Sequence, residues 1–201
     1  MEKPLIEKDW IGNKRTTYAN LGASNHVVDA REINDYYATH PQAVRDLLEV
    51  ENFSKQVLEP CCGGGHISNV LEQAGYQVTS RDLYDRGYGV SGIDFLGTRE
   101  VWEGDIVTNP PYRQAKEFVE KALDIVETGS KVAMILKIQF LESQSRRELF
   151  KKHPPKYVYV FSKRTYCAKN GDFENNKSAA VCYAWYIWEK GFKGEPRIRW
   201  I

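Results

Sequence analysis

A strand–turn–helix–strand pattern between residues 56 and 82 constrains the fold of this chain more than any other feature. Residues 56–60, QVLEP, predict a short strand that stops at a proline, and the following CCGGGH predicts a turn. Apolar residues then lie at positions 67, 70, 71 and 74, the spacing of one helix face, so a helix is expected up to residue 75. Residues 77–82 predict the next strand, and the whole pattern indicates a βαβ unit.

The rest of the chain continues this alternation. Strands are predicted at 104–109, 131–140, 156–163 and 178–189, and helices after residue 40 with Thr39 as N-cap, at 115–126 and at 143–153. Residues 83–92, rich in Gly and Tyr, predict a loop with a short third strand. Because no helix separates the last two strands, we expect a mostly parallel α/β sheet that ends in an antiparallel hairpin. Three aromatic residues of the last strand are expected in the core: Trp185, Tyr186 and Trp188.

The composition indicates a globular protein. Hydrophobic residues make up 42% of the 201 residues and charged residues 27%, and no apolar run reaches the roughly 18 residues that span a bilayer. The first residues contain no apolar stretch typical of a signal peptide, so a cytoplasmic location without membrane contact is expected. Residues 1–35 are polar and aperiodic and are predicted to be an N-terminal arm, which leaves residues 36–201 for the domain. The cysteines and histidines show no metal-ligand spacing, so reduced thiols and no metal are expected.

Positive charge is concentrated in the last third of the chain. Residues 137–201 contain 14 Lys+Arg and 6 Asp+Glu, whereas the net charge of the whole chain is +1. This asymmetry favours a polyanion as the partner of that part.

Polar and glycine residues gather where the predicted parallel strands end. Glu59 and the glycine turn follow the first strand, Asp82 ends the second, and Asn109 ends the strand at 104–109. Ligands of open α/β sheets bind outside the carboxyl ends of the strands, so these residues are expected to share one site. The turn lacks the Lys and Ser/Thr of a phosphate-binding loop, and Glu59 suits a cationic ligand rather than a pyrophosphate.

Two acidic positions suit a nucleoside. Asp82, at the end of the second strand, can bind both hydroxyls of a ribose. Asp94 can accept a hydrogen bond from an adenine amino group while Phe95 contacts the ring, and the alternative role of Asp94 is to cap a loop.

LEPCCGGG, Asp82 and NPPY together resemble the class I S-adenosylmethionine-dependent methyltransferases that act on exocyclic amino groups. The resemblance implies their Rossmann-like α/β fold with a mostly parallel seven-stranded sheet, and S-adenosyl-L-methionine as cofactor. It places the methionine part of the cofactor at the glycine turn and the ribose at the acidic residue, and YYATHP near the carboxylate end. The cofactor-binding residues implied are Thr39, Pro41, Glu59, Pro60, Cys61, Gly63, Gly65, Asp82, Leu83, Asp94, Phe95 and Asn109.

The motif NPPY supplies the catalytic residues in this resemblance: Asn109, Pro110, Pro111 and Tyr112. An aromatic amine attacks a methyl group through its nitrogen lone pair, which is normally delocalised into the ring. The side-chain oxygen of Asn109 and the carbonyl of Pro110 can accept the two N–H groups and so favour the reactive geometry, and the prolines hold both acceptors rigid. Tyr112 offers a face on which a planar base can stack.

The order of the motifs resembles gamma-type N6-adenine DNA methyltransferases, and the whole pattern resembles small enzymes of phages and prophages. DNA with a flipped-out adenine is therefore the expected substrate, with RNA as the other nucleic acid. Lys163, Arg164 and Tyr166 are expected to bind it, with Tyr166 pressing the target base against Tyr112. Methylation of RNA base amino groups or of a protein glutamine amide, and a non-catalytic cofactor-binding module, are the alternatives.

Overall fold

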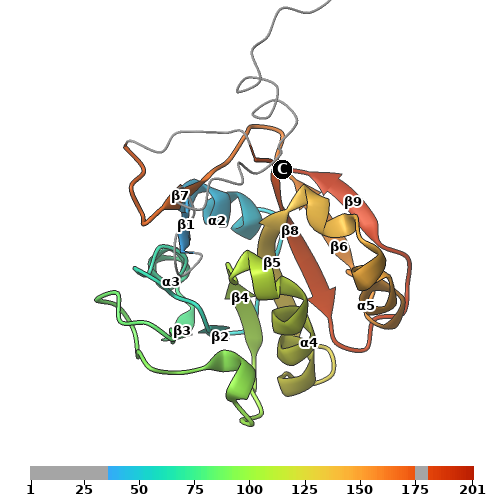
Figure 1. Cartoon of the computed structure of the whole chain (residues 1–201), viewed down its shortest axis with the longest axis horizontal. Coiled ribbons are helices and arrows are strands. Elements are labelled where there is room, and N and C mark those ends of the chain that lie inside the picture. The colour runs from blue at the N-terminus through green and yellow to red at the C-terminus, as the bar shows by residue number, and fades with distance from the viewer. Residues whose placement is uncertain (1–35, 175–180) are drawn as a thin grey trace, which may run out of the picture. The chain divides into compact units, whose positions relative to one another are not determined.

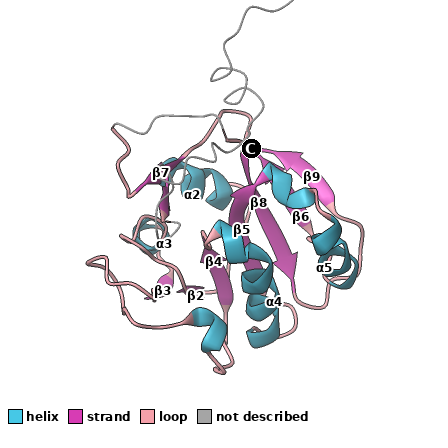
Figure 2. Ribbon diagram, in the orientation of Figure 1, coloured by secondary structure: helices cyan, strands magenta, loops and turns pink. Residues whose placement is uncertain are grey.

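The computed structural model describes residues 36–174 and 181–201 (Figure 1). The arm predicted for residues 1–35 lies outside the described residues. Helices cover both faces of a seven-stranded sheet (Figure 2), and no described helix combines the length and apolarity that crossing a membrane requires. The helices are α2 (Pro41–Leu48), α3 (Ser68–Gln73), α4 (Ala115–Ile125) and α5 (Arg147–Lys152), with short 3-10 helices η2 (Phe95–Gly97), η3 (Tyr112–Gln114), η4 (Ile138–Leu141) and η5 (Gln144–Arg146).

The sheet has the strand order β3-β2-β4-β5-β8-β6-β9. Strands β2 to β5 pair in parallel, β8 is antiparallel to both β5 and β6, and β9 is parallel to β6. All of these strands except β8 therefore run in one direction, which confirms the predicted parallel sheet with an antiparallel hairpin. The strands are β2 (Gln56–Glu59), β3 (Gln77–Ser80), β4 (Asp105–Thr108), β5 (Lys131–Lys137), β6 (Tyr157–Val160), β8 (Tyr183–Glu189) and β9 (Arg197–Trp200).

Both faces of the central strands are buried. In β5, Val132, Met134 and Leu136 pack in one core with α4, whereas Ala133 and Ile135 pack in a second core with α2 and α3. A strand covered on both faces is apolar at successive positions, which explains why its sequence shows no alternation. The aromatic residues of β8 lie in these cores as predicted: Trp185, Tyr186 and Trp188.

Two strands that the sequence did not predict form a separate ribbon beside α2. β1 (Tyr37–Thr39) pairs antiparallel with β7 (Cys167–Lys169), so the loop after β6 lies against the segment before α2. Thr39 ends β1, and the N-cap of α2 is His40, whose Nδ1 accepts a hydrogen bond from the backbone N–H of Gln42 at 3.1 Å. The predicted N-cap, Thr39, was wrong by one residue, because the backbone of Thr39 is already part of the ribbon.

The two edges of the sheet also differ from the prediction. The short third strand expected within residues 83–92 is reduced to a single bridge between Arg81 and Val90. At the other edge, β9 lies in a segment for which no strand was predicted. Its four residues are all exposed, and the alternation of arginine with Ile198 and Trp200 extends over only these four positions, so no strand was predicted there.

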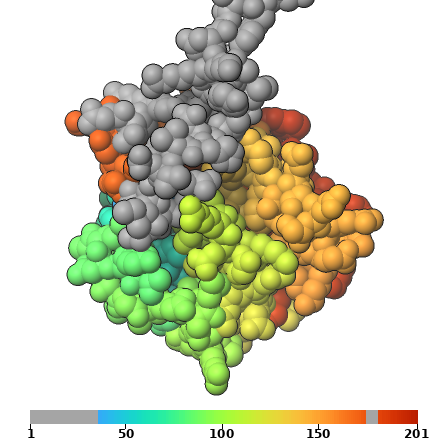
Figure 3. Space-filling view, in the orientation of Figure 1, coloured from blue at the N-terminus to red at the C-terminus, as the bar shows by residue number. Residues whose placement is uncertain are grey.

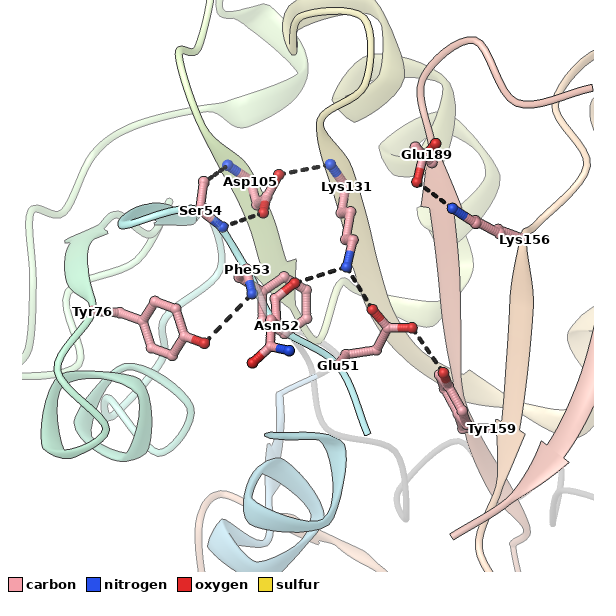
Figure 4. Close-up of polar contacts among 10 residues, drawn as sticks. All are labelled: Glu51, Asn52, Phe53, Ser54, Tyr76, Asp105, Lys131, Lys156, Tyr159 and Glu189. Carbon is pink, nitrogen blue, oxygen red and sulfur yellow. Dashed lines mark hydrogen bonds and ion pairs between the residues drawn. The ribbon is translucent and has the colours of Figure 1, made fainter. Parts of the chain in front are cut away.

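A polar network fixes the amino ends of the strands (Figure 4). The carboxylate of Asp105, at the start of β4, accepts hydrogen bonds from the backbone N–H groups of Ser54 at 2.6 Å and Lys131 at 2.7 Å. The Lys131 ammonium forms an ion pair with Glu51 at 2.7 Å, and the other oxygen of Glu51 accepts a hydrogen bond from Tyr159 at 2.7 Å. These bonds connect the segment before β2 to β4, β5 and β6. They hold the strands together at their amino ends, and so help to set the positions of the same strands at their carboxyl ends.

Candidate active site

A pocket of about 390 Å³ opens at the carboxyl ends of β2, β3 and β4. Figure 3 shows a recess between the green and the yellow-green surfaces, with blue-green atoms at its base. Five predicted site residues do not line the pocket: Pro41, Gly63, Gly65, Pro110 and Tyr112. All of them except Pro41, which begins α2, are next in sequence to a residue of the wall. The predicted residues that line it are Thr39, Glu59, Pro60, Cys61, Asp82, Leu83, Asp94, Phe95, Asn109 and Pro111.

The glycine turn is packed against two tyrosines of the chain. Gly63 has φ +53°, and a Cβ added there would lie 2.4 Å from the ring of Tyr36. Gly65 has φ +79°, and its Cβ would lie 2.7 Å from the ring of Tyr88. The Tyr36 hydroxyl also accepts a hydrogen bond from the backbone N–H of Gly64 at 3.0 Å. Glycine is thus required at this turn both for its backbone conformation and for the space that the tyrosines occupy.

Asp82 connects the end of β3 to the glycine turn. One carboxylate oxygen accepts a hydrogen bond from the backbone N–H of Gly63 at 2.8 Å, and the other accepts one from Tyr84 at 2.9 Å. These bonds fix the orientation of the carboxylate. Each oxygen can accept a second hydrogen bond, so the group can still receive the hydroxyls of a ligand from the pocket.

The Asp94–Phe95 pair forms another part of the wall. Asp94 caps η2, because its Oδ1 accepts a hydrogen bond from the backbone N–H of Leu96 at 3.0 Å. The capping role considered for Asp94 is therefore present, and the same residue lines the pocket. Phe95 is buried and stacks on Phe118 of α4, with ring centroids 5.2 Å apart.

Glu59 is a buried carboxyl group that supports the start of α3. Its Oε2 accepts hydrogen bonds from the backbone N–H of Ser68, at 2.8 Å, and from the Ser68 hydroxyl. Burial raises the pKa of Glu59 well above its usual range, although the bonds from Ser68 act in the opposite direction. Both bonds are made by one oxygen, and Glu59 also lines the pocket, so Oε1 is the atom left for a cationic ligand.

The orientation of the Asn109 amide is fixed by β1. Its Nδ2 donates hydrogen bonds to the carbonyl oxygen of Tyr37 at 2.6 Å and to Oγ1 of Thr39 at 3.0 Å. The Tyr37 carbonyl can only accept, so the nitrogen must face β1. The oxygen Oδ1 consequently points away from the ribbon and is available as an acceptor at the wall of the pocket.

Tyr112, at the start of η3, packs between other aromatic rings. Its ring centroid is 5.9 Å from those of both Tyr37 and Tyr183, and the Lys137 ammonium lies 5.0 Å from it. Burial raises the pKa of Tyr112 well above its usual range, so the phenol stays neutral. The preceding Pro110 is buried, and these contacts hold the backbone that follows Asn109.

The cysteines around the pocket are neutral thiols. All four cysteines of the chain are free. Burial raises the pKa of Cys62 to about 12 and that of Cys167 to about 11, and it raises the pKa of Cys61 well above its usual range. Cys167 lies beside the side-chain amide of Asn109, with Sγ 3.7 Å from Nδ2.

Comparison with known proteins identifies the fold. No protein-family model matches the chain, and no curated protein matches it. Similar solved structures include a candidate class I S-adenosylmethionine-dependent methyltransferase from Listeria monocytogenes, with a TM-score of 0.60 and 12% identity over 85% of this chain and 67% of that one. The chain has the class I methyltransferase fold.

Two other structures with this fold also resemble the chain. A candidate RNA methyltransferase from Pyrococcus horikoshii has a TM-score of 0.57 and 13% identity over 90% of this chain and 100% of that one. The 23S rRNA methyltransferase ErmE has a TM-score of 0.53 and 16% identity over 80% of this chain and 71% of that one. The pocket of this chain lies at the carboxyl ends of the parallel strands. Ligands of open α/β sheets generally bind at this position.

Several residues of the pocket wall were not predicted from the sequence. The most informative is Arg86, which is half-buried, with its guanidinium 4.0 Å from the ring centroid of Tyr36 and 5.6 Å from that of Tyr84. Within the described residues, Arg86 forms no ion pair with an acidic side chain. A Tyr- and Gly-rich loop gave no signal for this arrangement. The other wall residues missed are Tyr36, Tyr37, Ala38, Cys62, His66, Ile67, Tyr84, Ile93, Leu96, Arg113, Gln114 and Phe118.

The predicted substrate-binding residues occupy two different places. Lys163 and Arg164 are exposed after β6. Tyr166 packs on His40, at 5.1 Å between ring centroids, and on Phe173, at 6.0 Å. Tyr166 and Tyr112 therefore belong to different aromatic groups, and no contact between their rings is present.

Proposed function

We propose that this protein is a DNA methyltransferase that transfers a methyl group from S-adenosyl-L-methionine to the N6 amino group of adenine. The observation that carries the proposal is the fixed amide of Asn109. Both of its N–H groups are bound by β1, so its oxygen is the atom directed to accept a hydrogen bond at the pocket wall. The class I methyltransferase fold and the NPPY sequence support the same conclusion.

The pocket suits the cofactor in size and in charge. Its volume of about 390 Å³ lies within the range of small-molecule sites. In this proposal Asp82 binds the ribose hydroxyls, and Asp94 and Phe95 bind the adenine. Arg86 suits the carboxylate of the methionine part, because it is a cation on the wall. Glu59 Oε1 can accept a hydrogen bond from the ammonium, and that cation would favour release of the proton that burial holds on Glu59. When bound, the cofactor supplies an electrophilic methyl group.

The residues of NPPY position the attacking amine. Asn109 Oδ1 and the carbonyl oxygen of Pro110 accept its two N–H groups, which directs the nitrogen lone pair toward the methyl donor. The proline rings fix φ at two successive residues, so little reorganisation is needed when the amine arrives. The amine attacks through its own lone pair, so no general base is required before methyl transfer.

The substrate class rests on charge. Residues 137–201 contain 14 Lys+Arg and only 6 Asp+Glu. This positive charge favours a nucleic acid over a protein as the substrate. RNA is the second candidate, because two similar structures are described as RNA methyltransferases. A protein glutamine amide would present the same pair of N–H groups to Asn109 and Pro110, and it is the third. The fourth alternative is a non-catalytic cofactor-binding module.

Isotope-labelled methyl transfer tests the proposal directly. The purified protein is incubated with labelled S-adenosyl-L-methionine and, separately, with duplex DNA, single-stranded DNA, RNA and protein, and the digested products are identified by mass spectrometry. N6-methyladenine in DNA is expected, and Asn109→Ala should abolish it while cofactor binding is retained. Label only in RNA or protein would overturn the substrate, and cofactor binding without any label would favour the non-catalytic module.

The cofactor assignment of Arg86 has a test that does not need turnover. Calorimetry compares S-adenosylhomocysteine, which has the carboxylate, with methylthioadenosine, which lacks it. A hydrogen bond to a charged group contributes about 1.5–3 kcal/mol. Arg86→Ala should therefore weaken the binding of S-adenosylhomocysteine by about 10- to 150-fold and leave the affinity for methylthioadenosine unchanged. Arg81→Ala is the matched control, because Arg81 pairs with Glu100 at 2.6 Å outside the pocket wall. Equal losses for both ligands would refute the role given to Arg86.

A further inference from the structure

The last strand exposes an unusual set of side chains at one edge of the sheet. Trp200 is 70% exposed and Ile198 is 55% exposed, and the two lie on the same face of β9. Arg197 and Arg199 lie on the other face, where the Arg199 guanidinium is 4.7 Å from the ring centroid of Tyr157. A tryptophan exposed to this degree on an ordered strand is uncommon, because burial of its ring would be favourable.

Trp200 lies near the carboxyl end of its strand, on the side of the sheet where the carboxyl ends of β2, β3 and β4 form the pocket. β6 and β9 run in the direction of β2 to β5, so their carboxyl ends open on the same side as Asn109. The backbone N–H of Ile201 donates to Val160 at 3.0 Å, and that of Ser162 donates to Ile201 at 2.6 Å, which places the end of β9 beside the segment that leads to Lys163. In Figure 1 the end of β9, marked C, lies at the top of the view, as do β1 and β7.

The distance from the pocket follows from the strand order. Four strand-to-strand steps separate β4 from β9, and at about 4.8 Å a step they span about 19 Å. At about 3.4 Å per nucleotide, that distance corresponds to no more than about six nucleotides of one strand. A nucleic acid whose target base is held at Asn109 can therefore reach Trp200.

Charge decides between the two occupants that an exposed edge strand can have. A second copy of the chain could pair its own β9 antiparallel to this one, but the arginines of the two copies would then face one another on one side of the joined sheet. A polyanion has the opposite preference, because Lys163 and Arg164 follow the end of β6, Arg199 is next to Trp200 near the end of β9, and all three are exposed. The charges therefore favour a nucleic acid strand over self-association.

We propose that Lys163, Arg164 and Trp200 form a track for single-stranded nucleic acid that leads away from the pocket, and that Trp200 stacks on a base within about six nucleotides of the target. The inference rests on the proposed function and extends it. Stacking needs an exposed base face, so the track selects an unpaired flank. The cations before it contact the phosphates of the same strand.

Binding of fluorescein-labelled single-stranded DNA to the full chain, loaded with S-adenosylhomocysteine, tests the track. One oligonucleotide is about 16 nucleotides long and the other about 4, and both contain adenine. Trp200→Ala should lower the affinity for the long oligonucleotide by about 5- to 150-fold, because it removes the ring on which a base stacks. The affinity for the short oligonucleotide should not change, because that strand does not reach Trp200. Trp200→Phe should restore most of the affinity. Ile198→Ala is the matched control on the same face of the strand, one pair further from the carboxyl edge, and should bind as the unaltered protein does.

Three results would overturn the track. Unchanged affinity of Trp200→Ala for the long oligonucleotide would remove the stacking contact, and equal weakening of both lengths would indicate an effect on the pocket or the fold. Sedimentation that shows a dimer in the unaltered protein and a monomer in Trp200→Ala would assign β9 to self-association. If DNA is methylated while the track fails, the proposed function stands. If no oligonucleotide is bound or methylated, the proposed function and the track fail together.

Discussion

Replacement of Thr39 by valine tests whether β1 orients the catalytic amide. Thr39 Oγ1 accepts one N–H of Asn109 at 3.0 Å, and Thr39 is 2% exposed. Valine has nearly the same shape but cannot accept, so that N–H loses its partner in a buried place. A neutral hydrogen bond contributes about 0.5–1.5 kcal/mol, which corresponds to about a 2- to 13-fold loss of rate if the bond holds only the reactive arrangement. The Tyr37 carbonyl still binds the other N–H, so a larger loss is not expected.

Single-turnover methylation at saturating cofactor and DNA measures this loss. The rate of Thr39→Val should fall by about 2- to 13-fold. The dissociation constant of S-adenosylhomocysteine is measured separately, because Thr39 also lines the pocket and saturation must be kept in the variant. Thr39→Ser keeps the hydroxyl and should keep most of the rate. Asn109→Ala is expected to abolish methylation, so the role of Thr39 is tested in the single variants. An unchanged rate of Thr39→Val, or an equal loss of rate in Thr39→Ser, would refute that role.

Three further predictions concern the fold around the pocket. Gly63→Ala should lower the free energy of unfolding by about 1–3 kcal/mol in urea titrations, because its Cβ would lie 2.4 Å from Tyr36 at a positive φ; stability equal to that of the unaltered protein would contradict this packing. Asp105→Asn should lower the free energy of unfolding by about 1–3 kcal/mol without changing cofactor affinity, because one of two part-buried backbone N–H groups loses its charged acceptor at the end of the sheet opposite the pocket. Burial holds the pKa of Glu59 well above its ordinary 4.5, so the folded protein keeps a proton that the unfolded chain releases. The free energy of unfolding should therefore fall as the pH rises from about 4.5 toward the raised pKa, and Glu59→Gln should remove this part of the pH dependence, as measured by urea titration across that range.

Local patterns were enough to predict most of the sheet. The βαβ unit at 56–82, the helical stripe before β5 and the apolar run of β5 each follow from the spacing of apolar residues within one element. β1 and β7 were missed because each has only three residues, and they form by pairing with each other across more than a hundred positions of the chain. β9 alternates arginine with Ile198 and Trp200, but all four residues are exposed and the strand depends on its pairing with β6, so this short alternation was not recognised.

Some residues of the candidate site could be predicted from the sequence and others could not. Residues at strand ends, such as Glu59, Asp82 and Asn109, could be predicted because the strands themselves could be predicted and their carboxyl ends meet at one edge. Arg86 and Tyr36 could not, because the first lies in an irregular loop and the second is brought to the glycine turn by tertiary packing. The sequence also placed Tyr166 opposite Tyr112, whereas the β1–β7 ribbon directs Tyr166 toward His40.

The sequence by itself determined the parallel sheet, the glycine turn and the presence of an asparagine followed by two prolines, because these depend on periodicity and on backbone restrictions within a few residues. Only the tertiary structure decided which way the Asn109 amide faces. That choice depends on a carbonyl and a hydroxyl of Tyr37 and Thr39, some seventy positions earlier in the chain, as the separations of 72 and 70 residues record. A hydrogen bond acts over about 3 Å, so no property of the motif alone could fix it until folding brought β1 beside β4.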